Sequence, residues 1–429
     1  MNILKEVLKS EVKPALGCTE PIAVAYACSM ACQAVKEYYR LETVDVLSIK
    51  AEINPGVVKN GLGVCIPNAK GRKGNAIAAA LGAIGGQPLQ GMAVLQGISD
   101  AHLNLADGLV KSGKVEILCN KALKSLYIKA EVITSVGIGN VVIQNGHTNI
   151  IYVGVDGQVI EEISSNQRED LVFNEELSKM KIADLVGAVS AMDEDDYRYI
   201  QEGIDMNLDV SKAGLSLNKV GDSLKRMLER PIFKNDVLMT AKILVSCATD
   251  ARMAGMPLKV MSSGGSGNQG IVAILVPYHI GVNEGIDLKI IQRSIALSHL
   301  VNSYVKCFTG ELAPICGCAI AAGLGASAAI VYQQQPNAEA IGRATDLVIA
   351  NITGLLCDGA KGGCALKVVS STDCAILSAY YALGGFKVES SDGIIGQTPE
   401  QTICNLGRVA QIGFGSMDDT VLDIMLKKM

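Results

Sequence analysis

The spacing of apolar and polar residues changes twice along the chain and divides it into three parts. Residues 1–41 show helical spacing on either side of a break at Pro14 and Gly17, which predicts two helices. Residues 42–158 contain apolar runs of strand length, beginning with VDVLSIKAEI. From residue 159 to residue 429, segments with helical spacing and charged faces dominate.

The middle part has the pattern of a sheet. Its strand-like runs include VEILC, LYIKAEVIT and NVVIQ, and the pair Asn145-Gly146 after the last of them is a strong hairpin signal. We therefore predict an α+β fold, in which a smaller α+β domain (42–158) is inserted near the N-terminus of a mainly α-helical domain. Residues 1–41 are assigned to that helical domain, which continues over 159–429 and is rich in Ala/Gly helix contacts.

Composition limits the classes of partner. The chain of 429 residues is long enough for two domains, and its 49% hydrophobic residues provide a large core. Its 38 basic and 43 acidic side chains give a net charge of −5, without the basic clusters that nucleic acid or an anionic membrane would require. The N-terminal stretch lacks the apolar segment of a signal peptide, and the Ala/Gly-rich runs are shorter than a bilayer span. We expect a cytoplasmic protein with no nucleic-acid or membrane partner.

The cysteines are unevenly placed, because six of the thirteen lie between residues 307 and 374. An odd number in a long chain argues against a disulfide framework and favours metal binding or catalysis. The paired C-x2-C motifs of zinc ribbons and the C-x2-C-x2-C run of ferredoxins are absent. The spacing instead suits a cluster held between loops at helix ends. Cys307 and Cys374 fit inert thiols at helix contacts, whereas Cys357 and Cys364 flank a polar glycine-rich loop.

Another candidate site lies where the second predicted helix begins. Cys18 and Thr19 stand in a loop just before Glu20 and Pro21, at a helix N-terminus that favours an anion. The helix dipole is expected to lower the pKa of the Cys18 thiol and make it reactive. The alternative is that Cys18 is only a small buried residue.

Two polar stretches complete the set of candidates. His147, Thr148 and Asn149 follow the hairpin signal; they suit acid–base chemistry or carboxylate binding, or else form an ordinary surface turn. The loop SSGGSGNQG (262–270) precedes a predicted helix and has apolar flanks. Its hydroxyls and backbone N–H groups favour carboxylate or phosphate binding over a flexible linker.

Four motifs together resemble the iron–sulfur L-serine dehydratase α-chain superfamily, and most closely its YhaM-like L-cysteine desulfidase group. They are PALGCTEPIAVA, SSGGSGNQGI, GELAPICGCAIAAGL and CDGAKGGC. The first stands where serine dehydratases carry Ser-Ser-His-Thr-x-Gly-Pro, so that Cys18 replaces a histidine. It also matches the cysteine of the desulfidase LGCTEP motif, which acts as a base or as a ligand.

The resemblance implies a [4Fe-4S] cluster held by three cysteines, which by motif are Cys316, Cys357 and Cys364. Cys318 is an alternative to Cys316, because the two are only two residues apart. Three ligands leave one iron open as a Lewis acid. No pyridoxal phosphate is expected.

The implied reaction is β-elimination from a small L-amino acid. L-cysteine, giving sulfide, pyruvate and ammonia, is favoured because a thiolate suits iron better than a hydroxyl does. L-serine dehydratase activity is the first alternative, and a non-catalytic amino-acid or cluster-binding protein is the second. Cys18 is the first candidate for the catalytic base and His147 the second. The remaining candidates are expected to bind substrate, and they are Thr19, Glu20, Thr148, Asn149, Ser262, Ser263, Ser266 and Asn268. A homodimer is possible.

Overall fold

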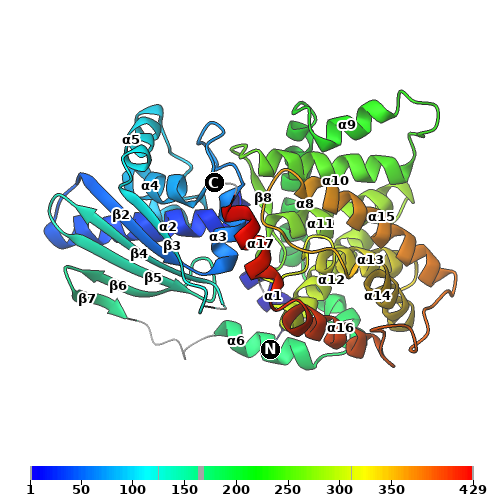
Figure 1. The fold of residues 1–429 in the computed structure, drawn as a ribbon. Helices are drawn as coiled ribbons and strands as arrows, with labels where there is room; N and C mark the ends of the chain where they lie inside the picture. The colour runs from blue at the N-terminus through cyan, green and yellow to red at the C-terminus, as the bar shows by residue number, and fades with distance from the viewer. Residues whose placement is uncertain (1, 124, 163–168, 311, 428–429) are drawn as a thin grey trace.

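The computed structural model describes residues 2–123, 125–162, 169–310 and 312–427. It has an α+β fold with a lobe built on a mixed sheet, here called the sheet lobe, beside a larger helical lobe (Figure 1). The predicted fold class is therefore confirmed. Each lobe has its own hydrophobic core.

The sheet has the strand order β3-β2-β4-β5-β6-β7. Strands β2 and β3 are parallel, and the other neighbours are antiparallel. The predicted hairpin is present between β5 and β6, with Asn145 at a φ of 57° in its turn. The strands are β2 (Val46–Ile53), β3 (Val115–Cys119), β4 (Tyr127–Thr134), β5 (Ile138–Gln144), β6 (Ile150–Val155) and β7 (Gln158–Glu162).

Helices cover one face of this sheet. They are α2 (Thr19–Tyr39), α3 (Pro55–Leu62), α4 (Asn75–Gly85), the 3-10 helix η1 (Pro88–Ala93) and α5 (Asp100–Lys111). Helix α2 packs against β4, β5 and α4. At its contact with α4, a Cβ on Gly82 of α4 would lie 2.1 Å from the carbonyl oxygen of Ala25 of α2. Only glycine permits so close an approach of the two helices.

The N-terminal helices differ from the prediction that placed residues 1–41 together in the helical domain. Helix α1 (Ile3–Glu11) does bury Leu4 and Val7 in the helical lobe. Helix α2 instead buries its residues in the core of the sheet lobe. Its Ala, Cys and Val side chains make it apolar on nearly every side, so sequence periodicity does not show which neighbour it contacts.

The helical lobe contains most of the remaining helices. A short antiparallel pair, β1 (Pro14–Leu16) and β8 (Lys259–Met261), lies beside them. The helices are α6 (Glu169–Lys179), α7 (Ile182–Ala188), η2 (Val189–Ala191), α8 (Glu194–Gly214), α9 (Val220–Met227), α10 (Val237–Met253), α11 (Gly267–Asn283), α12 (Leu288–Thr309), α13 (Ala321–Gln334), α14 (Ala338–Ile352), α15 (Cys364–Leu383), α16 (Pro399–Arg408) and the π-helical turn η3 (Val409–Gly413). The predicted helical part that begins at residue 159 includes residues 163–168, which lie outside the described residues.

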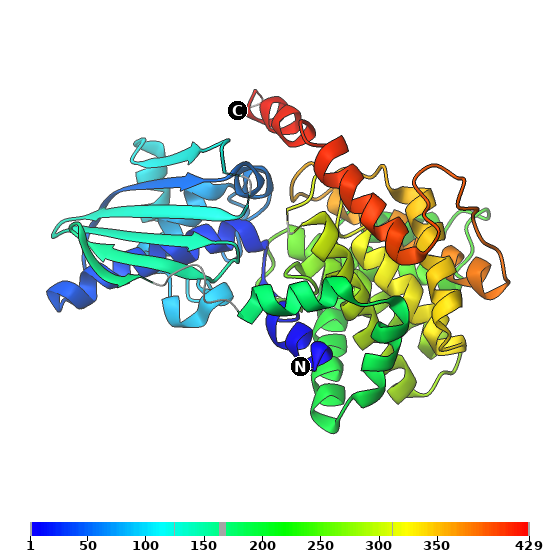
Figure 2. The same cartoon turned by 90° about the horizontal axis from the view of Figure 1, so that it is seen from below.

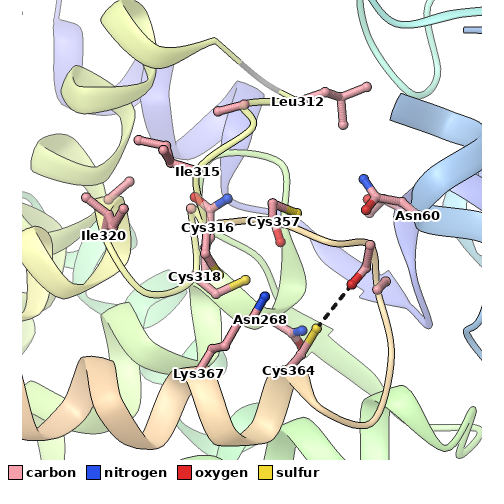
Figure 3. Close-up of a pocket in the computed structure, with 18 of the residues that line it drawn as sticks. Asn60, Asn268, Leu312, Ile315, Cys316, Cys318, Ile320, Cys357, Cys364 and Lys367 are labelled. Carbon is pink, nitrogen blue, oxygen red and sulfur yellow. Dashed lines mark hydrogen bonds between the residues drawn. The ribbon is translucent and has the colours of Figure 1, made fainter. Parts of the chain in front are cut away.

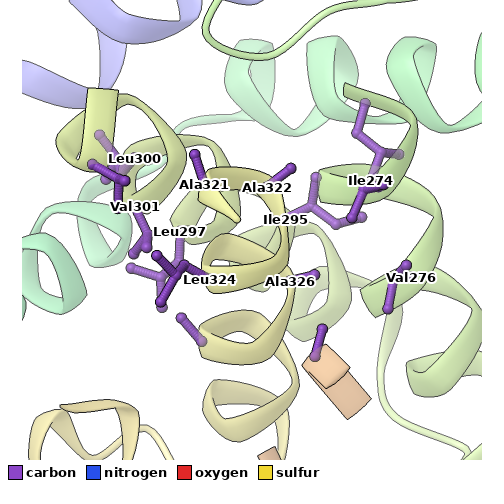
Figure 4. Packing of buried hydrophobic residues seen from close by; sticks show 14 of the residues in the cluster. Ile274, Val276, Ile295, Leu297, Leu300, Val301, Ala321, Ala322, Leu324 and Ala326 are labelled. Carbon is purple, nitrogen blue, oxygen red and sulfur yellow. The ribbon is translucent and has the colours of Figure 1, made fainter. Parts of the chain in front are cut away.

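The core of the helical lobe confirms the predicted Ala/Gly contacts. Figure 4 shows Ile274 and Ile295 packed beside the small residues of α13, including Ala322 and Ala326. A Cβ on Gly325 would lie 2.4 Å from the carbonyl oxygen of Ser298. Helices α12 and α13 therefore approach each other almost at backbone distance.

The chain finally returns to the sheet lobe through α17 (Met417–Leu426), which Figure 2 shows reaching out from α16. Leu422 joins the core of the sheet lobe, and Asp418 Oδ1 lies 2.5 Å from Lys59 Nζ. This helix therefore connects the two lobes. In the described part of the chain, no helix has both the length and the apolar character needed to cross a membrane.

Candidate active site

A pocket lies where α2 and α3 of the sheet lobe meet the helical lobe, and several helices begin at it. Cys18 and Ser266 are the N-caps of α2 and α11, Ile320 precedes α13, and Cys364 is the first residue of α15; all four line the pocket. The positive ends of these helix dipoles therefore meet at one place. Such an arrangement favours bound anions.

Two cysteine loops that are distant in sequence are held together by backbone hydrogen bonds. The N–H of Cys316 donates to the carbonyl of Leu355, and the N–H of Cys357 donates to the carbonyl of Pro314, each at 2.7 Å. Cys316 and Cys357 consequently line the same wall of the pocket. These two main-chain hydrogen bonds hold the two loops side by side.

Cys318 and Cys364 also line the pocket, and together with Cys316 and Cys357 they are called the cysteine group here. Figure 3 shows these four cysteines around a common space. Hydrogen bonding from Cys318 and the positive charge of Lys367 lower the pKa of Cys316 to about 7, against the effect of burial. Burial raises the pKa of Cys364 to about 11. Cys316 is thus the thiol most easily ionised at neutral pH.

The donor set fits an iron–sulfur cluster better than a single ion. Among the described residues, no group of three or more His, Cys, Asp or Glu side chains is placed to hold one metal ion. In a [4Fe-4S] cluster each thiolate ligand binds a different iron, so the ligands stand apart around the cluster. The four thiols, the helix N-termini and the nearby ammonium group of Lys367 suit an anionic cluster of that kind. Cys307 and Cys374 do not line the pocket; Cys374 is buried in the helical core.

Cys18 and Glu20 form a hydrogen-bonded pair in the same pocket. Cys18 Sγ donates to Glu20 Oε2 at 3.0 Å, and Thr19 Oγ1 donates to the same oxygen at 3.1 Å. Asn60 Nδ2 donates to Glu20 Oε1 at 2.8 Å. Glu20 was expected to bind substrate, but its carboxylate is already held by three protein donors.

The pair corrects the expectation of a lowered Cys18 pKa. Burial, followed by the negative charge of Glu20, raises the pKa of Cys18 well above its usual value. Burial also acts to raise the pKa of Glu20, but the charge of His147 and the hydrogen bond from Cys18 outweigh it and lower the pKa. Burial and the adjacent carboxylate together thus raise the pKa that the helix N-terminus was expected to lower. At neutral pH the thiol is protonated and the carboxylate is ionised.

His147, at the tip of the β5–β6 hairpin, lies near the Cys18–Glu20 pair. His147 is close enough for its charge to act on Glu20, and its Nε2 is buried without a hydrogen-bond partner among the described residues. Thr148 is exposed. Asn149 donates from Nδ2 to the carbonyl of Gln144 at 2.8 Å and so closes the turn. None of His147, Thr148 and Asn149 lines the pocket.

The first two serines of the glycine-rich loop support the structure and do not line the pocket. Ser262 Oγ accepts from the N–H of Lys13 at 2.9 Å and donates to the carbonyl of Glu11 at 3.0 Å. Ser263 Oγ is buried at 2.8 Å from Nδ1 of His299. Both hydroxyls are occupied by protein groups and anchor the loop.

Ser266 and Asn268 do line the pocket, as expected. Asn268 Oδ1 accepts a hydrogen bond from Nη1 of Arg252 at 3.0 Å. Arg252 and the lysines around the pocket were missed in the sequence. A basic residue within the small and apolar run SCATDARMAG was the signal available for Arg252.

Comparisons with known proteins identify the family. A family model described as the serine dehydratase alpha chain matches residues 129–423. The chain is 47% identical to a UPF0597 protein of Geobacter sulfurreducens over 100% of its own length and 99% of that protein. It is 42% identical to a UPF0597 protein of Elusimicrobium minutum over 100% of both chains. A UPF0597 protein of Caldanaerobacter subterraneus is 39% identical over 99% of this chain and 98% of that protein. The chain belongs to the serine dehydratase alpha chain family, which confirms the resemblance seen in its motifs.

Proposed function

We propose that this member of the serine dehydratase alpha chain family is a β-eliminating lyase that converts L-cysteine to sulfide, pyruvate and ammonia. The observation that supports it best is the shared pocket. The Cys18–Glu20 pair and the thiols of Cys316, Cys357 and Cys364 line one cavity. A proton acceptor and a cluster-binding group are therefore available to the same small substrate.

Cys316, Cys357 and Cys364 would hold a [4Fe-4S] cluster, with Cys318 as the alternative to Cys316. Such a cluster, when bound, supplies a Lewis acid at the iron that has no protein ligand. Iron in a sulfur environment is a soft acceptor and prefers a thiolate leaving group to a hydroxyl. This preference favours L-cysteine over L-serine.

Cys18 and Glu20 would together remove the proton from Cα of the substrate. The raised pKa of Cys18 and the lowered pKa of Glu20 keep the proton on Cys18 in the free protein, so its transfer to Glu20 would have to be driven by the change in charge when substrate binds. The Cys18 thiolate then accepts the α-proton of the substrate. The Cβ–S bond breaks as the Cα–Cβ double bond forms, and the sulfur leaves with the bonding electron pair. The aminoacrylate released in this way reacts with water to give pyruvate and ammonia. His147, which lies near Glu20, is the second candidate for the base, a role that requires its neutral imidazole.

The experiment is a product assay on anaerobically reconstituted protein with L-cysteine and L-serine in parallel. The proposal predicts equal amounts of sulfide and pyruvate from L-cysteine, with a higher kcat/KM than for L-serine. Preferential release of pyruvate from L-serine would instead identify a serine dehydratase. Binding of both amino acids without product would refute a lyase and favour a non-catalytic protein.

A matched pair of variants sharpens the assay. Cys18→Ser is expected to abolish sulfide release, because the hydroxyl is a far weaker acid than the thiol. Cys28→Ser is its control, since Cys28 is also buried on α2 but does not line the pocket. Equal activity of the two variants would remove Cys18 from the mechanism.

A further inference from the structure

We infer that Arg252 binds the α-carboxylate of the substrate, and that the pocket therefore selects α-amino carboxylates. This inference rests on the proposed function, because it assumes that the pocket receives a small amino acid. Arg252 lies in the last turn of α10, is 3% exposed and lines the pocket.

The guanidinium group is oriented by two neighbours at the start of α11. Its Nη1 donates to Asn268 Oδ1 at 3.0 Å. A Cβ on Gly267 would lie 2.3 Å from its Nε, so the absence of a side chain at Gly267 makes room for it. Asn268 thus fixes one edge of the guanidinium group, and the rest of the group remains available to a ligand.

No carboxylate of the described residues contacts Arg252 directly, and its charge acts on Glu20 only at longer range. Its Nε is buried without a hydrogen-bond partner, and it forms no ion pair with an Asp or Glu in the described part of the chain. Two other cations of the pocket have ion-pair partners, Lys59 with Asp418 and Lys367 with Asp358, whereas Lys306 contacts the backbone carbonyl of Gly264. A buried guanidinium group with an unpaired N–H and no carboxylate in direct contact is costly, so this position favours a bound anion.

A carboxylate matches the donors of the Arg252 side chain. The guanidinium group is planar and donates two parallel hydrogen bonds to the two oxygens of a carboxylate. The N-terminus of α11 beside it adds further positive potential. A small amino acid held by its carboxylate at this point stays in the pocket that Cys18 and the cysteine group line.

The test measures binding without turnover, using anaerobically purified full-length protein and isothermal titration calorimetry. L-alanine carries the carboxylate and ammonium groups of the substrate but no β-leaving group. L-alaninamide replaces the carboxylate with a neutral amide. We expect wild type to bind L-alanine at least about 30-fold more tightly than L-alaninamide, as for a buried charge pair.

Variants assign this preference to Arg252. Arg252→Gln is expected to weaken L-alanine binding at least about 30-fold and to leave L-alaninamide binding nearly unchanged. Arg252→Lys keeps the charge without the planar fork and is expected to lie between the two. The control is Arg198→Gln, an exposed arginine of α8 that is expected to bind L-alanine as wild type does.

The outcomes separate this inference from the proposed function. Unchanged L-alanine affinity in Arg252→Gln, with or without a loss of iron, would overturn the carboxylate assignment. Equal affinity of wild type for L-alanine and L-alaninamide would overturn it even if the variants fail to fold. Arg252-dependent L-alanine binding in a protein that releases no sulfide or pyruvate would support the carboxylate site and refute the lyase.

Discussion

Cys18 Sγ lies 3.0 Å from Oε2 of Glu20 and donates a hydrogen bond to it, within the pocket that the cysteine group lines. The neighbourhood raises the pKa of the thiol and lowers that of the carboxylate. Two titratable groups whose pKa values are pushed apart in this way are typical of an acid–base pair. Glu20 thus becomes as important to the proposed chemistry as Cys18.

Replacing Glu20 by Gln tests this pair. The amide keeps hydrogen-bonding capacity but cannot accept the thiol proton, so kcat for sulfide release is expected to fall about 100-fold or more. Removing the negative charge also removes one cause of the raised Cys18 pKa, so Cys18 should be alkylated faster at pH 8. Mass spectrometry of the Cys18 peptide measures the second effect. The control is Glu37→Gln, an exposed residue of the same helix; if both variants behave alike, the role of Glu20 is wrong.

Because His299 is fully buried, we predict that the free energy of unfolding falls in mild acid. Burial lowers its pKa to about 3, whereas the unfolded chain has a histidine pKa of about 6.5. The unfolded state therefore binds more protons below about pH 6.5, and the stability present above that pH falls as the pH is lowered towards 3. The slope is about 1.4 kcal/mol per pH unit for this residue.

Urea unfolding of wild type and His299→Gln between pH 7.5 and 5 measures this effect. The variant should lose less stability over the interval than wild type does. His279→Gln should change the pH dependence less than His299→Gln, because His279 is only partly buried, although its pKa is also lowered by burial. Identical pH dependence in wild type and His299→Gln would contradict a neutral buried histidine.

We predict that the ion pair between Lys59 of α3 and Asp418 of α17 stabilises the attachment of α17 to the sheet lobe. The Lys59 side chain is 2% exposed and Asp418 is 27% exposed. Asp418→Asn leaves the buried ammonium group without its charge partner and is expected to cost about 1.5–3 kcal/mol in the free energy of unfolding. Asp423→Asn on the same helix breaks only the half-exposed pair with Lys121 and should cost at most about 1 kcal/mol. Chemical denaturation of both variants compares them, and equal losses would contradict this account.

The sequence predicted those parts of the structure whose signals are local. Strand-length runs and the Asn145-Gly146 pair located the sheet and its β5–β6 hairpin. The small residues of α13 correctly indicated close helix contacts. Helix α2 was assigned to the wrong core, because an element that is apolar on nearly all sides carries no directional pattern.

The site was less predictable where it depends on tertiary contacts. The sequence motifs indicated Cys18, Ser266 and the cysteine group as site residues, and in the structure these residues line a common pocket. The raised pKa of Cys18 was missed because it depends on burial and on the position of the Glu20 carboxylate, neither of which follows from a helix N-terminus alone. Ser262 was expected to bind a ligand through its hydroxyl. In the structure this hydroxyl is hydrogen-bonded to backbone groups of Lys13 and Glu11, which are far away in the sequence.

The central claim is that the cysteine group holds an iron–sulfur cluster, and iron analysis tests it most directly. Iron and acid-labile sulfide are measured after anaerobic reconstitution of wild type and of the variants Cys316→Ser, Cys318→Ser, Cys357→Ser and Cys364→Ser. The control is Cys374→Ser, a buried thiol of α15 outside the pocket. The account predicts about four iron and four sulfide per wild-type and Cys374→Ser chain. It predicts clear loss in the Cys316, Cys357 and Cys364 variants, and retention in Cys318→Ser. Full cluster content in all of these variants, or wild-type protein without iron, would contradict it.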